Sequence, residues 1–412
     1  MRRIARSSTM KTLLSSLQCF SYALALLSFL LFGCGSDTEQ QAGRPTSQDS
    51  VTMVVAEGKK PMRLVTDRPP NLETPLRYFR EDFTPNDVFF VRWHLSNMPT
   101  AVNPDTFRLR ISGNVKAPLE LSLDELKNDF EQVSVNALCV CAGNARSCLQ
   151  PRVAGAQWVN GGMGNARWTG VRLKDVLAKA KADAKSVAVA FNGMDDPPLE
   201  TVPDFVKSLP FARANDGEVI IAYEMNGEPL PLLNGYPLKL VVPGWYATYW
   251  VGMLNDIRVY ADTFHGYWMD KAYRVPKGVS NANESPDSLA KDLEPISRIA
   301  IRSIFVSPEP DSVLTKGTRY EMEGLAFDGG SGIARVEIST DDGKSWTETR
   351  LDPSLGNYSW RRWRFPYTPA AAGKLRMLVR ATGVSGETQP LKHWNRSGYA
   401  RNEIESLELT VR

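Results

Sequence analysis

The chain has 412 residues, of which 42% are hydrophobic and 23% charged, so it is neither a fibre nor a disordered tail and should form two or three domains. Its net charge is +3, but four basic residues lie in the first 33 positions, which hold no acid, and without them 45 basic residues face 46 acidic ones. We therefore expect no nucleic-acid partner, because there is no basic excess to bind one.

Residues 1–33 are predicted to be a signal peptide. Basic residues come first, and the apolar run 22–32 that follows is too short for a comfortable membrane span. Leu31-Phe-Gly-Cys34 resembles the bacterial lipoprotein box, in which the cysteine receives lipid. We expect an exported protein on the periplasmic side, anchored to a bacterial membrane through Cys34. A conventionally cleaved signal and a single anchor helix are the alternatives, and the twin-arginine and general secretory routes both stay open.

Residues 34–65 are expected to form the flexible, lipid-anchored tether. Most of this segment is polar, as in Ser36-Asp-Thr-Glu-Gln-Gln-Ala-Gly-Arg-Pro45, and such a composition cannot bury a core. A chain of this kind would connect a folded domain to a bilayer and leave it free to meet a diffusing partner.

Residues 66–295 show a mixed pattern that predicts an α/β domain. Ser122-Leu-Asp-Glu125 matches a capping box and predicts a short helix through residue 130, while residues 169–180 carry apolar side chains at helical spacing. Asn226-Gly227 is a hairpin signal. Apolar runs predict strands at 107–111, 133–141, 187–191, 219–223 and 238–242.

The character of the chain changes beyond an acidic, serine-rich linker at 280–294. Alternating runs predict strands near 336–340, 375–380 and 407–412, with little helical periodicity between them. Strands at this spacing over about 115 residues indicate an immunoglobulin-like β-sandwich at 296–412. The predicted fold class is therefore α+β, with a mixed α/β domain followed by a C-terminal sandwich.

The segment most informative about chemistry surrounds Cys141. This cysteine ends an apolar strand and is followed by Gly143-Asn144, so the backbone should turn just past the thiol, and Arg146 is close enough to present a positive charge there. A thiolate needs such surroundings to ionise, and it suits a transition metal. The spacing alone equally fits a buried pair of hydrophobe-like cysteines, Cys139 and Cys141, or a disulfide.

Five segments together resemble the sulfite oxidase family of molybdenum enzymes. The resemblance runs from about residue 75 to the C-terminus, where the sandwich resembles the family's molybdopterin dimerisation domain. Its nearest type is the bacterial periplasmic sulfite dehydrogenase, whose catalytic subunit passes electrons to a separate cytochrome c. The segments are Phe89-Phe-Val-Arg-Trp-His-Leu95, Cys141-Ala-Gly-Asn-Ala-Arg-Ser147, Asn165-Ala-Arg-Trp-Thr-Gly-Val-Arg-Leu173, Ala222-Tyr-Glu-Met-Asn-Gly-Glu-Pro-Leu-Pro231 and Tyr236-Pro-Leu-Lys-Leu-Val-Val-Pro-Gly244.

The resemblance assigns the catalytic residues one by one. Cys141 would be the protein thiolate on molybdenum, beside the two dithiolene sulfurs of one molybdopterin. Arg92 would lie beside the substrate and His94 beside the pterin and the entrance, both touching cofactor as well. Arg146 matches a second substrate arginine, and Tyr273 falls where the family keeps a tyrosine near the metal's oxo group. Planar guanidinium groups suit sulfite and sulfate, because they bind oxyanions through paired charge-assisted hydrogen bonds.

Three further residues are implied as cofactor contacts. Asp195 matches a cofactor-binding aspartate of the family, Asn234 stands where animal members have histidine, and Lys239 where they have arginine. Both replacements can still bond a phosphate or pterin edge, although lysine loses the bidentate fork of arginine. Cys139 and Cys148 match nothing catalytic, and their pairing is left open.

The resemblance implies that the chain oxidises sulfite to sulfate and hands electrons to an external cytochrome c. Because the sequence lacks Cys-x-x-Cys-His, we expect no haem in this chain. A homodimer and a heterodimer with a cytochrome subunit both stay open. The alternatives are the superfamily branch that reduces methionine sulfoxide or another oxo-compound, and a cofactor-free, lipid-anchored binding module.

Overall fold

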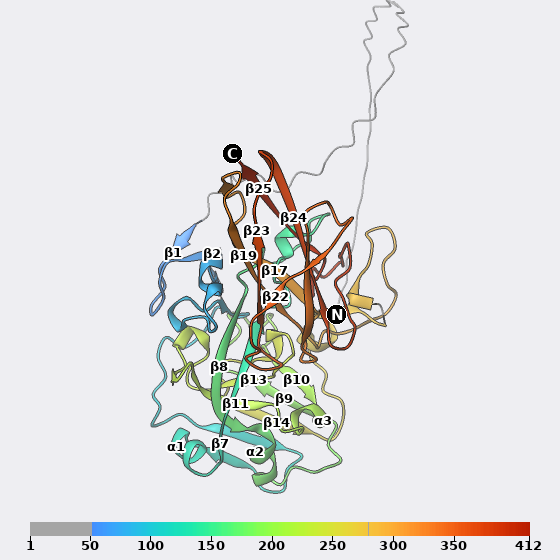
Figure 1. The fold of residues 1–412 in the computed structure, drawn as a ribbon. Coiled ribbons are helices and arrows are strands. Elements are labelled where there is room, and N and C mark those ends of the chain that lie inside the picture. The colour runs from blue at the N-terminus through green and yellow to red at the C-terminus, as the bar shows by residue number, and fades with distance from the viewer. Residues whose placement is uncertain (1–51, 279) are drawn as a thin grey trace, which may run out of the picture. The chain divides into compact units, whose positions relative to one another are not determined.

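A computed structural model describes residues 52–278 and 280–412 (Figure 1). The predicted signal peptide at 1–33 and the lipid site at Cys34 lie outside these residues. In the described ranges no helix is both long and apolar enough to cross a membrane.

The first described residues belong to a four-stranded sheet in the order β1-β2-β3-β4. Its strands are β1 (Met53–Val54), β2 (Met62–Thr66), β3 (Asn71–Glu73) and β4 (Val91–Arg92). Residues 53–65, which we expected within the flexible tether, are therefore folded against the domain, so the tether boundary at 65 must be corrected.

Two side chains show how this segment is fixed to the domain, although it follows a polar stretch. Met62 is fully buried in a small apolar cluster with Leu72 and Trp93. The Lys59 ammonium donates to the backbone oxygens of Asn86 and Phe89 at 2.7 and 3.1 Å. Seven of the thirteen residues at 53–65 are apolar, and Val54, Ala56 and Leu64 pack against the same cluster, so the segment differs from the polar stretch before it.

Two further sheets form the body of the mixed domain. One has the strand order β10-β9-β14-β5-β6, and the other has β12-β11-β8-β7 with β13 paired to β11. Only β14 and β5 pair in parallel within these sheets. The strands are β5 (Leu109–Gly113), β6 (Leu119–Leu121), β7 (Gln132–Val140), β8 (Met163–Arg172), β9 (Ala188–Asn192), β10 (Lys207–Pro210), β11 (Ile220–Met225), β12 (Glu228–Pro229), β13 (Lys239–Val241) and β14 (Asp256–Tyr260).

Helices in this domain are short. The capping box is confirmed at α1 (Leu123–Asn128), and the Asn226-Gly227 turn joins β11 to β12 with both residues at positive φ. The helix expected from residue 169 was wrong at its start, because residues 169–172 continue β8 and pair with β11. The remaining helices are α2 (Leu173–Lys179), α3 (Phe211–Ala214), α4 (Tyr267–Asp270), η1 (Leu76–Arg80), η2 (Asn86–Val88), η3 (Arg146–Cys148), η4 (Leu232–Asn234), η5 (Ala247–Tyr249) and η6 (Ser280–Ala282).

The C-terminal part has the two sheets of the expected sandwich, in the orders β17-β19-β23-β22 and β18-β25-β24-β20-β21. Apolar side chains from both sheets form its core, and the predicted α+β class is confirmed. A short pair, β15 (Arg274–Pro276) with β16 (Leu293–Pro295), precedes it. The sandwich strands are β17 (Arg302–Ser307), β18 (Val313–Leu314), β19 (Tyr320–Phe327), β20 (Ile333–Ser339), β21 (Thr347–Glu348), β22 (Arg350–Leu351), β23 (Arg361–Tyr367), β24 (Gly373–Gly383) and β25 (Glu405–Val411).

Buried hydrogen bonds join the sandwich to the mixed domain. Asn165 donates to Ser359 Oγ at 2.7 Å, and Arg302 Nη2 donates to Asn160 Oδ1 at 2.6 Å. The loop between β24 and β25 contributes the carbonyl of Gly398, which accepts from Arg146 Nε at 3.2 Å. Residues from the C-terminal part therefore help to build the site described next.

Candidate functional site

The Cys141 thiol lies at the end of β7, where the backbone turns. Cys141 is buried, its N–H donates to Gly162 O at 2.9 Å, and the Asn144 N–H returns to Cys141 O at 2.9 Å. These backbone bonds fix the residue without using its sulfur. The thiol is therefore held in place and left available for another partner.

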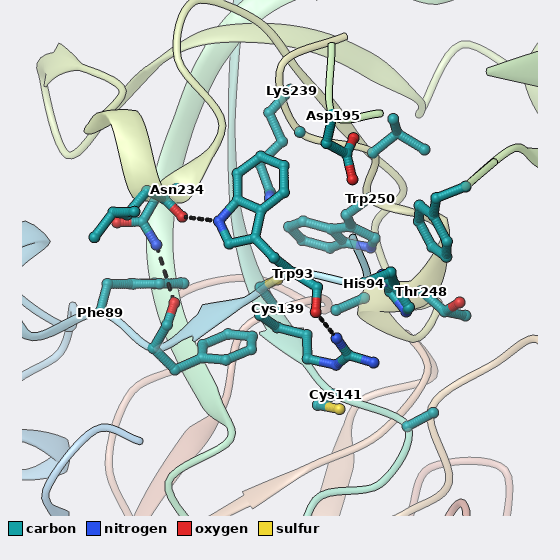
Figure 2. Close-up of a pocket in the computed structure, with 18 of the residues that line it drawn as sticks. Phe89, Trp93, His94, Cys139, Cys141, Asp195, Asn234, Lys239, Thr248 and Trp250 are labelled. Atoms are coloured by element: carbon teal, nitrogen blue, oxygen red, sulfur yellow. Dashed lines mark hydrogen bonds between the residues drawn. The ribbon is translucent and has the colours of Figure 1, made fainter. Parts of the chain in front are cut away.

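Two cavities meet at this cysteine. The first extends towards Lys239 and Asp195, and the second towards Arg146 and Trp158. Both are lined by the same three residues, Arg92, Cys141 and Tyr273. Figure 2 shows the first cavity, with Cys141 at the bottom of the view and Lys239 and Asp195 at the top.

Tyr273 makes the central hydrogen bonds between these cavities. Its hydroxyl accepts from Arg92 Nη2 at 3.3 Å and lies 2.5 Å from His94 Nε2. Burial, together with the positive charges of Arg92 and Lys207, lowers the pKa of His94 well below its ordinary value, so the imidazole is neutral near pH 7. Burial also raises the pKa of Tyr273, which keeps the phenol protonated. The predicted trio Arg92, His94 and Tyr273 is thus one hydrogen-bonded group.

Arg146 projects into the second cavity as a buried cation. It donates to the backbone oxygens of Gly398, Ala156 and Ser397 at 3.2–3.3 Å, and its guanidinium lies 5.0 Å from the centre of the Tyr399 ring. No carboxylate within the described ranges lies within ion-pair distance of it, and no Asp or Glu lines this cavity. A cavity with two arginines and no acid favours a small anion.

Glycines explain how the arginine fits in so confined a space. A Cβ added to Gly143, Gly155 or Gly398 would come within 3.0 Å of the Arg146 side chain. Gly143 belongs to the Cys141 segment itself, so the spacing of cysteine, glycine and arginine there has a steric reason. The turn at Gly143-Asn144 can be predicted from the sequence, whereas this packing requirement cannot.

The first cavity collects the three predicted cofactor residues. The Lys239 ammonium has no hydrogen-bond acceptor among the described residues, and burial lowers its pKa. Asp195 is buried, and desolvation with the nearby Asp204 and Asp196 raises its pKa to about 7. Asn234 differs, because its Oδ1 accepts from Lys59 at 2.5 Å and its Nδ2 donates to a backbone oxygen. Asn234 therefore lines the wall with both polar atoms already bonded.

Unpartnered polar groups in this cavity fit a polar, anionic cofactor. Lys239 could bind a phosphate, and the Asp195 carboxyl could accept from heterocycle N–H groups. The buried Thr248 Oγ1, which also lines the cavity, has no partner within the protein. Together with a free thiol at the opposite end, this donor set suits a metal-bearing pterin.

The cysteines are all reduced in the described ranges. Cys139, Cys141 and Cys148 are free, so neither the Cys139–Cys148 pair nor a bond between Cys139 and Cys141 is formed. Burial raises the pKa of Cys139 to about 12, which keeps it a thiol. In the described ranges no three His, Cys, Asp or Glu side chains gather as a metal-binding group.

Sequence reasoning missed four residues at the second cavity or next to it. Trp158 lines the cavity, is fully buried, and its indole N–H has no partner. Tyr399 stacks on Tyr273 with ring centres 5.0 Å apart, and Trp268 lies edge-on to His94 at 5.2 Å. Lys207 lies 5.1 Å from the Tyr273 ring. No spacing in the sequence marks them: Trp158, Lys207 and Tyr399 lie far from Tyr273 in the chain, and Trp268, five residues before it, belongs to no motif.

Comparisons with known proteins agree with this geometry. A family model described as the oxidoreductase molybdopterin binding domain matches residues 95–268, and one described as the Mo-co oxidoreductase dimerisation domain matches residues 294–404. The mitochondrial sulfite oxidase of Rattus norvegicus is 34% identical over 371 residues, covering 85% of this chain and 66% of that protein. The chain therefore spans just under two thirds of the length of this relative.

Two other matches cover a larger share of the matched protein. The sulfite oxidase of Gallus gallus is 32% identical over 342 residues, which cover 80% of this chain and 73% of that protein. The sulfane dehydrogenase SoxCD from Paracoccus pantotrophus superposes with a TM-score of 0.72 over 92% of both chains. At 24% identity, this structural likeness establishes the fold alone.

Proposed function

This chain belongs to the sulfite oxidase family of molybdenum enzymes, and from that premise we propose that it oxidises sulfite to sulfate at a molybdenum centre held by one molybdopterin. The observation that carries the proposal is the position of Cys141, where a cavity with unpartnered Lys239 and Thr248 groups meets an acid-free cavity containing Arg92 and Arg146. One side would hold the cofactor and the other the oxyanion.

The residues divide into those that hold cofactor and those that handle substrate. Cys141 would hold the metal through its thiolate, while Lys239 and Asp195 would bind the pterin and its phosphate. When bound, the molybdenum cofactor supplies the two-electron oxidation and the oxygen transferred to sulfur. The chain's own part is to bind, orient and desolvate the anion.

Substrate handling follows from charge and hydrogen bonding. The guanidinium groups of Arg92 and Arg146 would bind the oxygens of sulfite, with the unpartnered Trp158 N–H as a further donor. Sulfite and water give sulfate, two protons and two electrons. Because neutral His94 and protonated Tyr273 share a hydrogen bond, the Tyr273 oxygen and His94 Nε2 can hold a proton beside the reacting anion.

Metal analysis and turnover test this proposal directly. Purified protein should contain about one molybdenum per chain and should reduce an added cytochrome c when sulfite is supplied. We propose cytochrome c as the acceptor because two electrons must leave one at a time through another protein. Methionine sulfoxide, tested as an oxidant with a reduced dye, serves as the comparison substrate. Protein without molybdenum, or with molybdenum but active only on the sulfoxide, would contradict the proposal.

Replacing Arg92 by glutamine should mainly raise KM for sulfite. One charge-assisted contact is worth roughly 1.5–3 kcal/mol, which corresponds to a roughly 10- to 150-fold weaker apparent affinity. Steady-state kinetics on variant protein with matched molybdenum content measures the effect. Arg110, whose side chain is largely exposed and pairs with Asp256 at 3.7 Å, provides a matched Arg→Gln control. An unchanged KM in the Arg92→Gln enzyme would contradict the role of Arg92 in binding sulfite.

We further propose that the protein is exported and lipid-anchored through Cys34. The support is the basic, apolar and Gly33-Cys34 order of the first residues. Intact mass of membrane-extracted protein should show lipid at Cys34, and Cys34→Ala should release the protein from the membrane. An unlipidated N-terminus would contradict the anchor.

A chain starting at Thr52 keeps β1 and Lys59 and should stay active, unlike one starting at Met62, which lacks both.

A further inference from the structure

A lysine lies fully buried beside the active-site tyrosine. Lys207 is the first residue of β10, and none of its surface is exposed. Lysine is almost never fully buried unless it is paired with an acid. Neither the sequence motifs nor the proposed reaction accounts for this residue.

The surroundings of the Lys207 ammonium are aromatic rings and one carbonyl. Nζ donates to Trp268 O at 2.7 Å and lies 4.6 Å from the centre of the Tyr249 ring and 5.1 Å from that of Tyr273. No carboxylate within the described ranges comes within ion-pair distance of it. Burial accordingly lowers the pKa of Lys207 to about 7, with no acid to oppose the shift.

Packing alone does not explain a cation at this position. An ammonium removed from water without a counter-charge destabilises the folded state, whereas leucine or methionine could fill the same space without that cost. The contacts that offset this cost join Lys207 to two residues of the site, Trp268 and Tyr273. Tyr273 and Trp268 both line the second cavity, and Trp268 lies edge-on to His94.

The Tyr273 backbone also needs external support. Its φ is 56°, in the left-handed region that side chains other than glycine rarely adopt. Such conformations persist where surrounding contacts over-determine them. Tyr273 has a stacked ring, Tyr399, and a cation, Lys207, against its aromatic ring, in addition to the hydrogen bonds of its hydroxyl.

We infer that Lys207 is a positioning residue for the oxidation, holding the Tyr273 ring and the Trp268 carbonyl so that the Tyr273 hydroxyl stays between Arg92 and His94. This inference rests on the proposed function. Lys207 does not touch the substrate cavity itself and acts through Tyr273. Below its lowered pKa of about 7 the Lys207 amine is charged, and a cation held by desolvated rings contributes enough to affect the position of the Tyr273 hydroxyl.

Lys207→Met tests the inference in the molybdenum-loaded enzyme. We expect kcat to fall about tenfold, since a desolvated cation–π contact is worth about one factor of ten or more, with KM for sulfite much less affected. Molybdenum content and the thermal midpoint should not fall, because the variant removes an unpaired buried charge. Lys207→Arg, which keeps the cation, should retain most of the turnover.

A double-mutant cycle separates positioning from a merely structural role. If Lys207 acts through the Tyr273 hydroxyl, Lys207→Met should cause little further loss of kcat in a Tyr273→Phe background. Lys179→Met is the matched control, because Lys179 also lies over a ring, Phe130 at 4.9 Å, but on the exposed end of α2. That variant should leave kcat unchanged.

Several results would overturn the inference. Unchanged kcat in folded Lys207→Met, or a loss equally large with and without the Tyr273 hydroxyl, would exclude action through Tyr273. If Lys207→Met and Lys207→Gln both fail to fold while Lys207→Arg folds, the cation is structural and the inference is wrong. Wild-type protein without molybdenum or sulfite turnover would instead contradict the proposed function.

Discussion

Cys141→Ser should abolish sulfite oxidation and leave the fold intact. Serine oxygen is a harder donor than thiolate and remains protonated at neutral pH, so it is a poor ligand for this metal. Changes to residues that merely support metal ligands cost 10–100-fold, so loss of the ligand itself should lower kcat by more than about 100-fold. The fold should survive because the hydrogen bonds that fix residue 141 come from its backbone.

The control for this variant is Cys148→Ser. Cys148 is also a free thiol in the same segment, but it is exposed and lines neither cavity. Kinetics, molybdenum analysis and thermal melting should be measured on both variants. Full turnover by folded, molybdenum-loaded Cys141→Ser would exclude Cys141 from the mechanism.

Local sequence signals predicted the elements whose cause is local. The Ser122–Glu125 capping box and the Asn226-Gly227 turn are each specified by two residues no more than three positions apart, and both form as expected. The helix expected from residue 169 began too early, because the helical spacing of its apolar residues starts only at Leu173, where α2 begins. Thr169 and Val171 instead belong to β8 and pair with β7 and β11, so tertiary pairing decided the structure of residues 169–172.

The N-terminal segment shows where a composition average over a long window fails. Seven of the thirteen residues at 53–65 are apolar, but the polar stretch before them dominates the average over 34–65. Met62 and Lys59 fix the segment to strands and loops far along the chain. Lys59 bonds to Asn234, 175 residues away. A contact of that separation has no signature within the segment, so no local pattern could have predicted it.

The residues of the site also fall into two groups, those that motifs indicate and those that only the fold brings together. Five residues carried by motifs line the two adjoining cavities: Arg92, His94, Cys141, Arg146 and Tyr273. Their roles towards a metal and a substrate stay a prediction of the resemblance. Lys207 and Tyr399 could not be found, because a lysine in a strand is normally exposed and a tyrosine normally packs. Their importance follows only from the ring contacts that the fold creates.

Glu405→Gln should be the most destabilising single change considered, at about 3–5 kcal/mol. The Glu405 carboxylate pairs with two buried arginines, Arg302 and Arg401, and the small cavity beside these arginines is also lined by Cys141. Removing the negative charge leaves Arg302 buried without a carboxylate and leaves Arg401 with Glu403 as its remaining partner. Asn160, which accepts from Arg302 at 2.6 Å, cannot replace a charge.

The pH dependence of this loss provides its own check. Burial opposes ionisation of Glu405, but Arg401 and Arg302 outweigh it and lower its pKa below the ordinary value of 4.5. The stabilisation is therefore fully present above about pH 4.5 and is lost as pH falls through the lowered pKa of the folded state. Urea unfolding at pH 7 should show the full difference between wild type and Glu405→Gln, and the difference should shrink as pH falls below 4.5. Glu408→Gln, on the exposed face of the same strand, should change stability little at either pH, and an equal effect of both variants would show that the buried pairing contributes nothing.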